Sequence, residues 1–432
     1  MRLFSTKRSV EEVSLKEAVF KGLPDDNGLF MPTEIPTLPD SFFDKIDTLS
    51  FQEIAYEVAH TLIGDEIPAE DLKDIITDAV NFDAPLVSVD ENIHVLELFH
   101  GPSLAFKDFG ARFMSRLISY FLQKEKQEIN ILVATSGDTG SAVAQGFLGM
   151  PGINVTILYP SGKVSLNQEK QLTTLGQNIT ALEIDGVFDD CQKLVKTAFL
   201  DKELNEKLSL SSANSINIAR LIPQSFYYFY SYAQLVKQGK KVVFCTPSGN
   251  FGNLCGGLIA QKMGLPIHHF IASTNANDVV PEYLHTGTFE AKHSVPTISN
   301  AMDVGNPSNF PRITELFGNE YKKVTESISG YSFDDEETSL ALAEVFLESD
   351  YIMCPHTAVG YLGVKAYQQD HKEDVNYVVL ATAHPSKFSD VVEPIIGKEP
   401  EMPERLKAII NQDKVSIPLS SEFDEFKSFL LA

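Results

Sequence analysis

Hydrophobic positions change their spacing near residue 93, and from there short apolar runs alternate with amphipathic stretches. The first series contains the runs IHVLELF, INILVAT, INVTILYP and ITALEI, each followed by a segment with helical spacing. Near-continuous apolar strands with helices between them are typical of a parallel sheet covered on both faces. The pattern predicts an α/β fold, with a first parallel-sheet module over residues 93–235.

A second series of the same kind contains the runs KVVFCTPS, IHHFIAST, YIMCP and NYVVLATA, and it predicts a second module over residues 236–432. A long aromatic-rich stretch, SINIARLIPQSFYYFYSYAQLVKQ, is predicted to be one helix that joins the modules. Residues 1–92 contain scattered prolines and two helical patterns, at 51–63 and 68–80, which indicate an accessory region. Residues 277–335 are rich in Gly, Pro and polar residues, so they are predicted to be loops outside the core.

The chain of 432 residues has a formal net charge of -24. This excess of negative charge argues against non-specific binding to nucleic acid or to an anionic membrane, since both need a basic protein surface. No apolar run is long enough to span a bilayer, and the first residues lack the apolar core of a signal peptide. We therefore expect a cytoplasmic protein with no nucleic acid and no membrane partner. The oligomeric state is not predicted.

Four loops follow predicted strands, and ligands of open α/β sheets bind at the carboxyl ends of strands. Two of these loops, TSGDTG at 135–140 and PSGNFGN at 247–253, combine glycines, hydroxyls and a helix N-terminus, which are features of an anion site. Asp138 would repel a phosphate from the first loop and can cap the helix expected to begin near Ser141. The second loop is therefore the better phosphate cradle, although a tight turn with an N-cap explains either loop alone.

Lys107 stands after a Gly-Pro turn and three apolar residues in HGPSLAFKDF, at the start of a predicted helix. A helix N-terminus disfavours a cation, and apolar neighbours also favour the neutral amine that attacks carbonyl groups. With a phosphate cradle and no metal or nucleotide motif, this suggests pyridoxal 5′-phosphate held by Lys107 as a Schiff base. A lysine that extends its ammonium group into solvent from a helix start is the structural alternative.

The ordered set HGPSLAFKD, ATSGDTGSA, PSGNFGN, SANSINIAR and ATAHPSKF resembles the threonine synthase family of fold-type II pyridoxal-phosphate enzymes. The motifs spread over about 300 residues in the expected order. The resemblance implies two parallel-sheet modules of the tryptophan synthase β-like architecture with an N-terminal accessory region. One departure is Asp138, where the wider fold-type II group commonly has asparagine. A second is Phe4-Ser5-Thr6-Lys7, where a tyrosine and an arginine are more usual, and these residues receive no role.

The resemblance also implies roles for the matched residues. Lys107 would be the Schiff-base lysine and proton shuttle, Thr382 would place its hydroxyl at the pyridine nitrogen, and Asp138 would face the phenolic oxygen. The cofactor phosphate would be bound by the backbone N–H groups of Gly249, Asn250, Phe251, Gly252 and Asn253. The substrate's α-carboxylate would be bound by Thr135, Ser136, Gly137 and Thr139.

The substrate phosphate needs further donors, and Arg220 with Ser215 and Asn217 is the first choice because a guanidinium fork matches phosphate. An exposed arginine in an ion pair is the alternative. Ser103 and Lys163 are weaker candidates. A further polar segment could be either a lid over the site or a surface loop, and the sequence favours a surface loop. This segment contains Asn306, Ser308 and Asn309.

No metal site is predicted, because the histidines at strand ends share no ligand spacing: His100, His356 and His384. His100 is a candidate for contact with substrate or cofactor, whereas His268 and His269 lie in a predicted strand and are expected to be structural. Four cysteines without close pairing are expected to be small buried residues.

The activity implied by the resemblance is conversion of O-phospho-L-homoserine and water to L-threonine and phosphate, in threonine biosynthesis. Two alternatives stay open. One is a serine or threonine dehydratase-like β-eliminase, which needs no pocket for a γ-phosphate. The other is a binding protein that keeps the fold without the chemistry.

Overall fold

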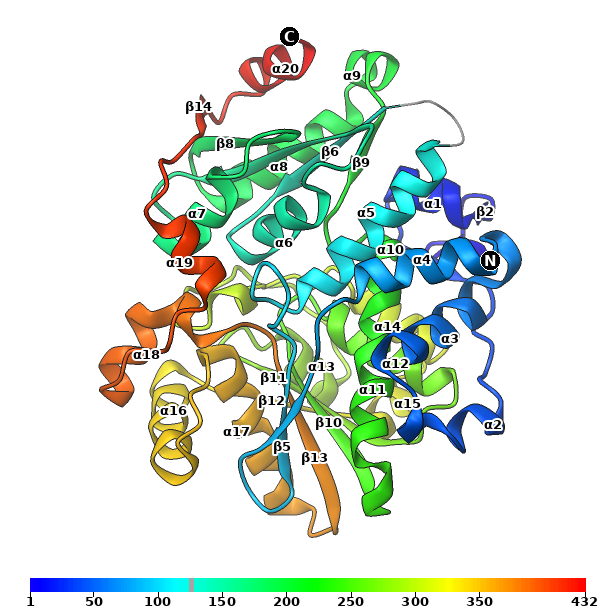
Figure 1. Cartoon of the computed structure of the whole chain (residues 1–432), viewed down its shortest axis with the longest axis vertical. Coiled ribbons are helices and arrows are strands. Elements are labelled where there is room, and N and C mark those ends of the chain that lie inside the picture. The colour runs from blue at the N-terminus through cyan, green and yellow to red at the C-terminus, as the bar shows by residue number, and fades with distance from the viewer. Residues whose placement is uncertain (124–127) are drawn as a thin grey trace.

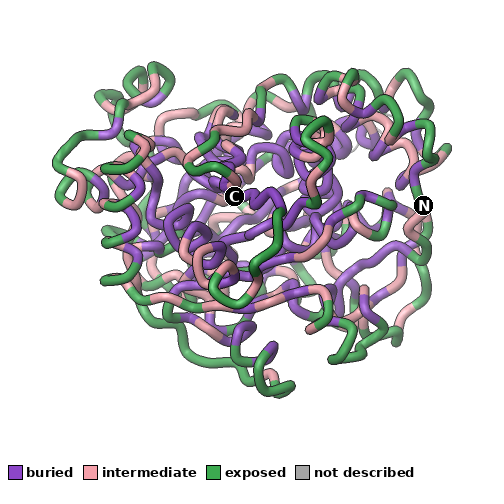
Figure 2. The backbone as a smooth tube through the Cα atoms, turned by 90° about the horizontal axis from the view of Figure 1, so that it is seen from below, coloured by how far each residue is buried: buried purple, intermediate pink, exposed green. Residues whose placement is uncertain are grey.

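The computed structural model describes residues 1–123 and 128–432. Two large sheets, both mainly parallel, form its centre (Figure 1). They lie one above the other in Figure 1, and an N-terminal layer covers one side of the junction between them. Helices flank both sheets, and buried residues are concentrated in the interior of the tube in Figure 2. The predicted α/β fold with two parallel-sheet modules is confirmed.

The first sheet has five parallel strands in the order β14-β8-β7-β6-β9. These strands are β6 (Ile129–Ala134), β7 (Ile153–Pro160), β8 (Ile179–Asp185), β9 (Leu210–Ser212) and β14 (Ile417–Ser420). Its associated helices are α5 (Lys107–Gln123), α6 (Asp138–Phe147), α7 (Leu166–Thr173), α8 (Phe188–Leu200), α9 (Lys202–Lys207) and α20 (Phe423–Leu431).

The second sheet has six strands in the order β12-β11-β10-β13-β5-β4, and only β4 runs antiparallel to its neighbour. These strands are β4 (Leu86–Ser88), β5 (Ile93–Glu97), β10 (Lys241–Pro247), β11 (Ile267–Thr274), β12 (Ile328–Ser332) and β13 (Val375–Ala381). Its principal helices are α12 (Gly252–Lys262), α13 (Val279–Thr286), α16 (Asp335–Ser349), α17 (Pro355–Asp370) and α18 (Ser389–Ile396).

Two strands lie in the sheet opposite to the one expected from their position along the chain. β5, the first strand of the predicted 93–235 module, pairs with β13 of the second sheet. β14, near the end of the predicted 236–432 module, pairs with β8 of the first sheet, reached through α19 (Glu404–Ile410). The predicted boundaries therefore do not separate the sheets. An apolar strand pattern shows that a strand is buried but carries no information about its pairing partner.

The aromatic-rich stretch is broken rather than one helix. It contains α10 (Ile218–Leu221), the 3₁₀ turn η3 (Ile222–Ser225) and α11 (Phe226–Leu235). Pro223 stands in the first turn of η3, where it cannot continue a helical hydrogen-bond ladder. Tyr227, Tyr228 and Phe229 are fully buried, so this segment forms the core between the modules.

The N-terminal layer contains an antiparallel sheet in the order β2-β1-β3 and the two expected helices. Its strands are β1 (Arg2–Ser5), β2 (Val13–Ser14) and β3 (Phe30–Pro32), and its helices include α1 (Leu15–Lys21), α3 (Phe51–Ile63) and α4 (Ala69–Ala79). Ser50 and Glu53 form a capping box at the start of α3, which explains where this helix begins.

Residues 277–335 are more ordered than predicted. They contain α13, the 3₁₀ turn η5 (Asn300–Met302), α14 (Phe310–Leu316), α15 (Tyr321–Ser327) and β12. Asn309 and Arg312 have no exposed surface, so the prediction that this segment lies outside the core is wrong for them. Polar residues can be buried when backbone carbonyl groups satisfy their donors, and a hydropathy pattern does not reveal this.

The four cysteines are buried and free, as predicted. Among the described residues, no helix has both the length and the apolar character to cross a bilayer.

Candidate functional site

The loops that follow β6, β10 and β13 and the start of α5 form the candidate site. Ala105 and Ala383 form an antiparallel bridge. Two backbone hydrogen bonds extend this contact, from Phe106 N to Thr382 O at 2.9 Å and from His384 N to Leu104 O at 3.1 Å. The turn before Lys107 is therefore attached directly to the end of β13.

Lys107 is the first residue of α5, as the sequence predicts. Its side chain is 19% exposed, and its Nζ lies 3.7 Å from Asp138 Oδ2. Leu104 has a φ of 60°, a backbone conformation that is uncommon for residues other than glycine. The strained turn directs the amine to the junction of the two modules instead of into solvent, so the alternative of a surface lysine is wrong.

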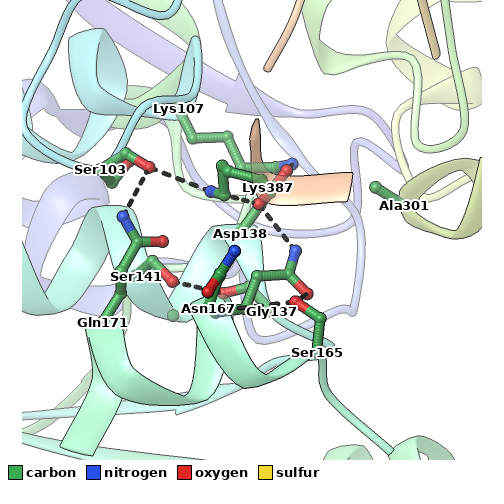
Figure 3. Close-up of polar contacts among 12 residues, drawn as sticks. Ser103, Lys107, Gly137, Asp138, Ser141, Ser165, Asn167, Gln171, Ala301 and Lys387 are labelled. Carbon is green, nitrogen blue, oxygen red and sulfur yellow. Dashed lines mark hydrogen bonds and ion pairs between the residues drawn. The ribbon is translucent and has the colours of Figure 1, made fainter. Parts of the chain in front are cut away.

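Asp138 is contacted by a second lysine. Lys387 Nζ lies 2.5 Å from Asp138 Oδ1, and Lys387 also donates to Ser103 O at 3.0 Å. Gln168 Nε2 donates to Asp138 Oδ1 at 2.9 Å. Figure 3 shows Lys107 and Lys387 converging on Asp138.

Burial and neighbouring charges set the protonation of this cluster. Burial lowers the pKa of Lys107, the Asp138 carboxylate opposes that shift, and Lys387 and Arg220 add to it. Burial alone would raise the pKa of Asp138, but Lys387 and Lys107 outweigh it and hold the pKa below its ordinary value. The site thus contains an ionised carboxylate and a lysine biased toward the neutral amine.

The helix that follows the TSGDTG loop is not capped in the way that the sequence predicted. The Thr135 hydroxyl, not Asp138, accepts from the N–H groups of Gly137 at 3.0 Å and Gly140 at 2.8 Å. The helix begins at Asp138 rather than near Ser141, so Asp138 lies in its first turn and directs its carboxylate to the lysines. Ser136 is exposed at the loop tip and Thr139 is partly exposed.

The PSGNFGN loop leaves most of its backbone donors free, although Ser248 N donates to Ser273 O at 2.9 Å. In the described part of the chain, no acceptor is recorded for the N–H groups of residues 249–253. Phe251 has a φ of 59° and precedes α12, whose first amides have no intrahelical partner. Free amides at a helix N-terminus match the oxygens of a phosphate, so this loop fits the cofactor phosphate.

Two residues of this region were predicted to contact the cofactor, Thr382 through its hydroxyl and Asn253 through its backbone N–H. Thr382 follows β13 and is 8% exposed, and its backbone oxygen accepts from Phe106. The Asn253 Oδ1 is used internally, because it accepts from Tyr227 at 2.6 Å and from Tyr228 at 3.0 Å. The Asn253 Nδ2 is buried without a described partner, so this group and the backbone amide are both left as donors for a phosphate.

The segment predicted as a surface loop contacts the PSGNFGN loop. Ser308 Oγ donates to Asn250 Oδ1 at 3.0 Å, and Asn309 N donates to Asn250 O at 3.3 Å. A Cβ added to Gly249 would lie 2.8 Å from the Cα of Met302. Asn306, in contrast, is exposed. The segment is thus packed against the phosphate loop, and Gly249 is required for that close approach.

Arg220 is 3% exposed, and burial lowers its pKa to about 10. Its guanidinium donates to Ala213 O, while its buried Nε has no described partner. The influence of Arg220 on the pKa of Lys107 places both cations in one region. The alternative of an exposed ion-paired arginine is therefore wrong.

Asn217 has a structural role instead of the predicted contact with substrate. Its Oδ1 accepts from Ala219 N as the N-cap of α10, and its Nδ2 donates to Val19 O and Ser212 O. It is fully buried, with both ends of its amide occupied. Ser215 is partly exposed and stays in the candidate set.

Arg312 was not identified from the sequence. It is fully buried and donates to the carbonyl groups of Phe30, Ser215 and Ile216 and to Asn309 Oδ1. It therefore ties the N-terminal layer to the Ser215 turn and to the segment over the phosphate loop.

The hydrogen-bond partners and positions of the remaining candidate residues indicate their roles. His384 caps η6 (Pro385–Phe388) through Ser386, and His100 pairs with Glu97 at 2.7 Å. His356 Nε2 accepts from Ala301 N at 3.2 Å, and burial lowers its pKa to about 4. Lys163 is exposed beyond β7. His268 and His269 lie in β11, and the described residues form no cluster suited to a metal ion.

Known proteins similar to the chain agree with this arrangement. A family described as pyridoxal-phosphate dependent enzyme matches residues 82–383. Families described as threonine synthase N terminus and threonine synthase, C-terminal match residues 2–80 and 357–430.

Full-length relatives and solved structures are similar as well. Threonine synthase of Buchnera aphidicola is 44% identical over 435 residues, covering 100% of both chains. The crystal structure of threonine synthase from Escherichia coli is 42% identical with a TM-score of 0.92, covering 100% of this chain and 99% of that one. A pyridoxal-phosphate-bound threonine synthase from Brucella melitensis is 35% identical with a TM-score of 0.93, covering 100% and 98%.

Proposed function

Because the chain belongs to the pyridoxal-phosphate-dependent threonine synthase family, we propose that it converts O-phospho-L-homoserine and water to L-threonine and phosphate. One observation carries the proposal. Lys107, Arg220 and the loop at 249–253, whose backbone amides have no described acceptor, all lie at the junction of the two modules. We place the reaction in the cytoplasm, with no nucleic acid partner.

The residues present fit the cofactor. The N–H groups of residues 249–253 would bind its phosphate, Lys107 would attach to its carbonyl, and the Thr382 hydroxyl would accept or donate at its ring nitrogen. When bound, pyridoxal phosphate withdraws electrons from the substrate and so acidifies the hydrogens that must be removed.

Lys107 would remove and return protons, and this role is supported by its largely buried side chain and its bias toward the neutral form. A neutral amine near physiological pH is both a nucleophile and a general base. The restricted exposure of its side chain limits competition from water.

Substrate recognition needs donors for two anionic groups. We propose that Arg220, Ser215 and Ser103 bind the phosphate, because the Arg220 Nε and the Ser103 Oγ are buried without a described partner. We propose that the TSGDTG loop binds the α-carboxylate through the exposed Ser136 and the partly exposed Thr139, together with the buried Thr135 and Gly137 of the same loop. Asn217 is excluded from this set.

The test compares two activities of the purified protein loaded with pyridoxal phosphate. Phosphate and threonine formed from O-phospho-L-homoserine are expected, and Lys107→Ala should abolish both products together with the near-visible absorbance of the bound cofactor. Ammonia release from serine or threonine without phosphate release would instead support the dehydratase alternative. A protein that releases neither product would support the binding protein.

Arg220 provides the discriminating variant. Arg220→Met should raise KM for the phosphorylated substrate by about tenfold to a hundredfold, because a charge-assisted contact contributes roughly 1.5–3 kcal/mol. Near-visible absorbance of the loaded variant should be retained. Unchanged KM would remove Arg220 from the proposed phosphate site.

A further inference from the structure

Lys387 is a second buried lysine for which the proposed chemistry has no role. Its side chain has no exposed surface, and its ammonium group contacts Asp138 Oδ1 at 2.5 Å and Ser103 O at 3.0 Å. A buried ammonium ion needs such partners, because burial without them is strongly unfavourable. Lys387 is therefore occupied by its neighbours and is not free to attack a carbonyl.

The two lysines share Asp138 unequally. Lys387 makes a direct contact with Oδ1, which also accepts from Gln168 at 2.9 Å. Lys107 is 3.7 Å from Oδ2 and is 19% exposed. Since electrostatic attraction and hydrogen bonding both weaken with distance, Lys387 neutralises more of the carboxylate charge than Lys107 does.

The surrounding charges point in the same direction. Lys107 of α5 faces Asp138 of α6, Lys387 of η6 and Arg220 of α10. Asp138 is also faced from the α17 side by His356 and Cys354, both of which burial keeps uncharged near neutral pH.

Asp108 adds one carboxyl group near Arg220, and burial raises its pKa to about 6. Even with Asp108 ionised, a protonated Lys107 would give three cations facing two carboxylates. Removal of the Lys107 proton relieves this excess of positive charge.

We propose that Lys387 is a positioning residue which takes Asp138 as its own counter-ion and thereby leaves Lys107 deprotonated and reactive at neutral pH. Without Lys387, Asp138 would pair with Lys107 and hold it as an unreactive ammonium ion. The inference rests on the proposed function in one respect only, which is that the electrophile attacked by Lys107 is the carbonyl group of the cofactor.

The direct test measures Lys107 in the full-length protein after the cofactor has been removed. The rate of Lys107 acetylation by acetic anhydride is followed as a function of pH by peptide mass spectrometry. Lys387→Met should move the midpoint upward by about one pH unit or more, and Asp138→Asn should move it downward. The double variant should return toward the wild type. Shifts of opposite sign and mutual compensation are not expected from a purely structural role.

Two controls accompany the series. Lys207→Met removes an exposed lysine that pairs with Glu203, so the Lys107 midpoint should not move. Lys387→Arg retains the cation and should keep the midpoint closer to wild type than Lys387→Met does. If Lys387→Met does not fold, as judged by circular dichroism, Lys387→Gln removes the charge while retaining a hydrogen-bond donor for Ser103.

A second readout uses the loaded protein. The return of near-visible absorbance after pyridoxal phosphate is added at pH 7 should be slower in Lys387→Met, by about twofold if the raised Lys107 midpoint lies near pH 7 and by nearly tenfold if it lies well above pH 7, because the neutral fraction of the amine falls accordingly. An unchanged Lys107 midpoint in Lys387→Met, or in Lys387→Gln where Lys387→Met does not fold, overturns the inference, whether or not threonine is made. Failure of wild-type phosphate release overturns the proposed function while leaving the acetylation result intact.

Discussion

Replacement of Arg312 by methionine should destabilise the protein and loosen the Ser215 turn. Arg312 makes five hydrogen bonds to four oxygen atoms, those of Phe30, Ser215 and Ile216 and the Oδ1 of Asn309. Methionine preserves most of the apolar stem but leaves all four oxygens without this partner. At about 1 kcal/mol for each acceptor left unpaired, the loss of stability is about 4 kcal/mol. The contacts to Ser215 and Ile216 are only partly buried, and methionine has no charge to desolvate, so the lower end of the expected loss is about 3 kcal/mol.

The assay is urea unfolding of the cofactor-free protein, with Arg8→Met as the matched control. The Arg8 side chain is 62% exposed and pairs with Glu315, so its replacement should cost only about 0–1 kcal/mol. Arg312→Met should also raise KM for the phosphorylated substrate, because Ser215 loses its attachment. If the two variants lower the free energy of unfolding equally, the hydrogen bonds of Arg312 do not stabilise the junction as argued.

Three further predictions follow from single residues. Burial raises the pKa of Asp108 to about 6, so the stability that protonated Asp108 contributes is fully present below about pH 4 and is lost as the pH rises through 6. Asp108→Asn does not titrate, so in urea unfolding its free energy of unfolding should rise relative to that of the wild type by up to about 3 kcal/mol between pH 4 and 7. A difference between the two proteins that does not change with pH would contradict the raised pKa. Asn217→Ala should lower the free energy of unfolding by about 1–2 kcal/mol through loss of its cap and its link to Val19, with KM unchanged; a large rise in KM would return Asn217 to the substrate site. Gly249→Ala should weaken pyridoxal-phosphate binding at least about tenfold, because its Cβ would lie 2.8 Å from the Cα of Met302, as measured by absorbance titration; normal affinity would show that the neighbouring turn moves without cost.

The α/β fold and the location of the site were predictable because their signals are local. Apolar runs identify buried strands, and ligand loops follow strands, so Lys107 and both glycine-rich loops were found without any knowledge of pairing. The sheet membership of β5 and β14 was not predictable, since a parallel strand has the same apolar character in either sheet.

The roles of Lys387, Asn217 and Arg312 depend on partners far along the chain. Lys387 contacts Asp138 across 249 positions, and Arg312 contacts Phe30 across 282. The one signal available for Lys387 was its place in ATAHPSKF, a few residues after a buried strand, which is the same kind of position that made Lys107 noticeable. For Arg312 the polar composition of its segment indicated solvent, whereas backbone carbonyl groups satisfy its donors in the interior.

The pairing of β14 with β8 has a consequence for synthesis of the chain. Residues 179–185 leave the ribosome long before residues 417–420, so the outer edge of the first sheet has no partner until nearly the whole protein has been made. An open strand edge is a site for association between nascent chains. This sheet has its other four strands by residue 212 but is completed last, and a chain that terminates before residue 417 would keep that edge exposed for its lifetime.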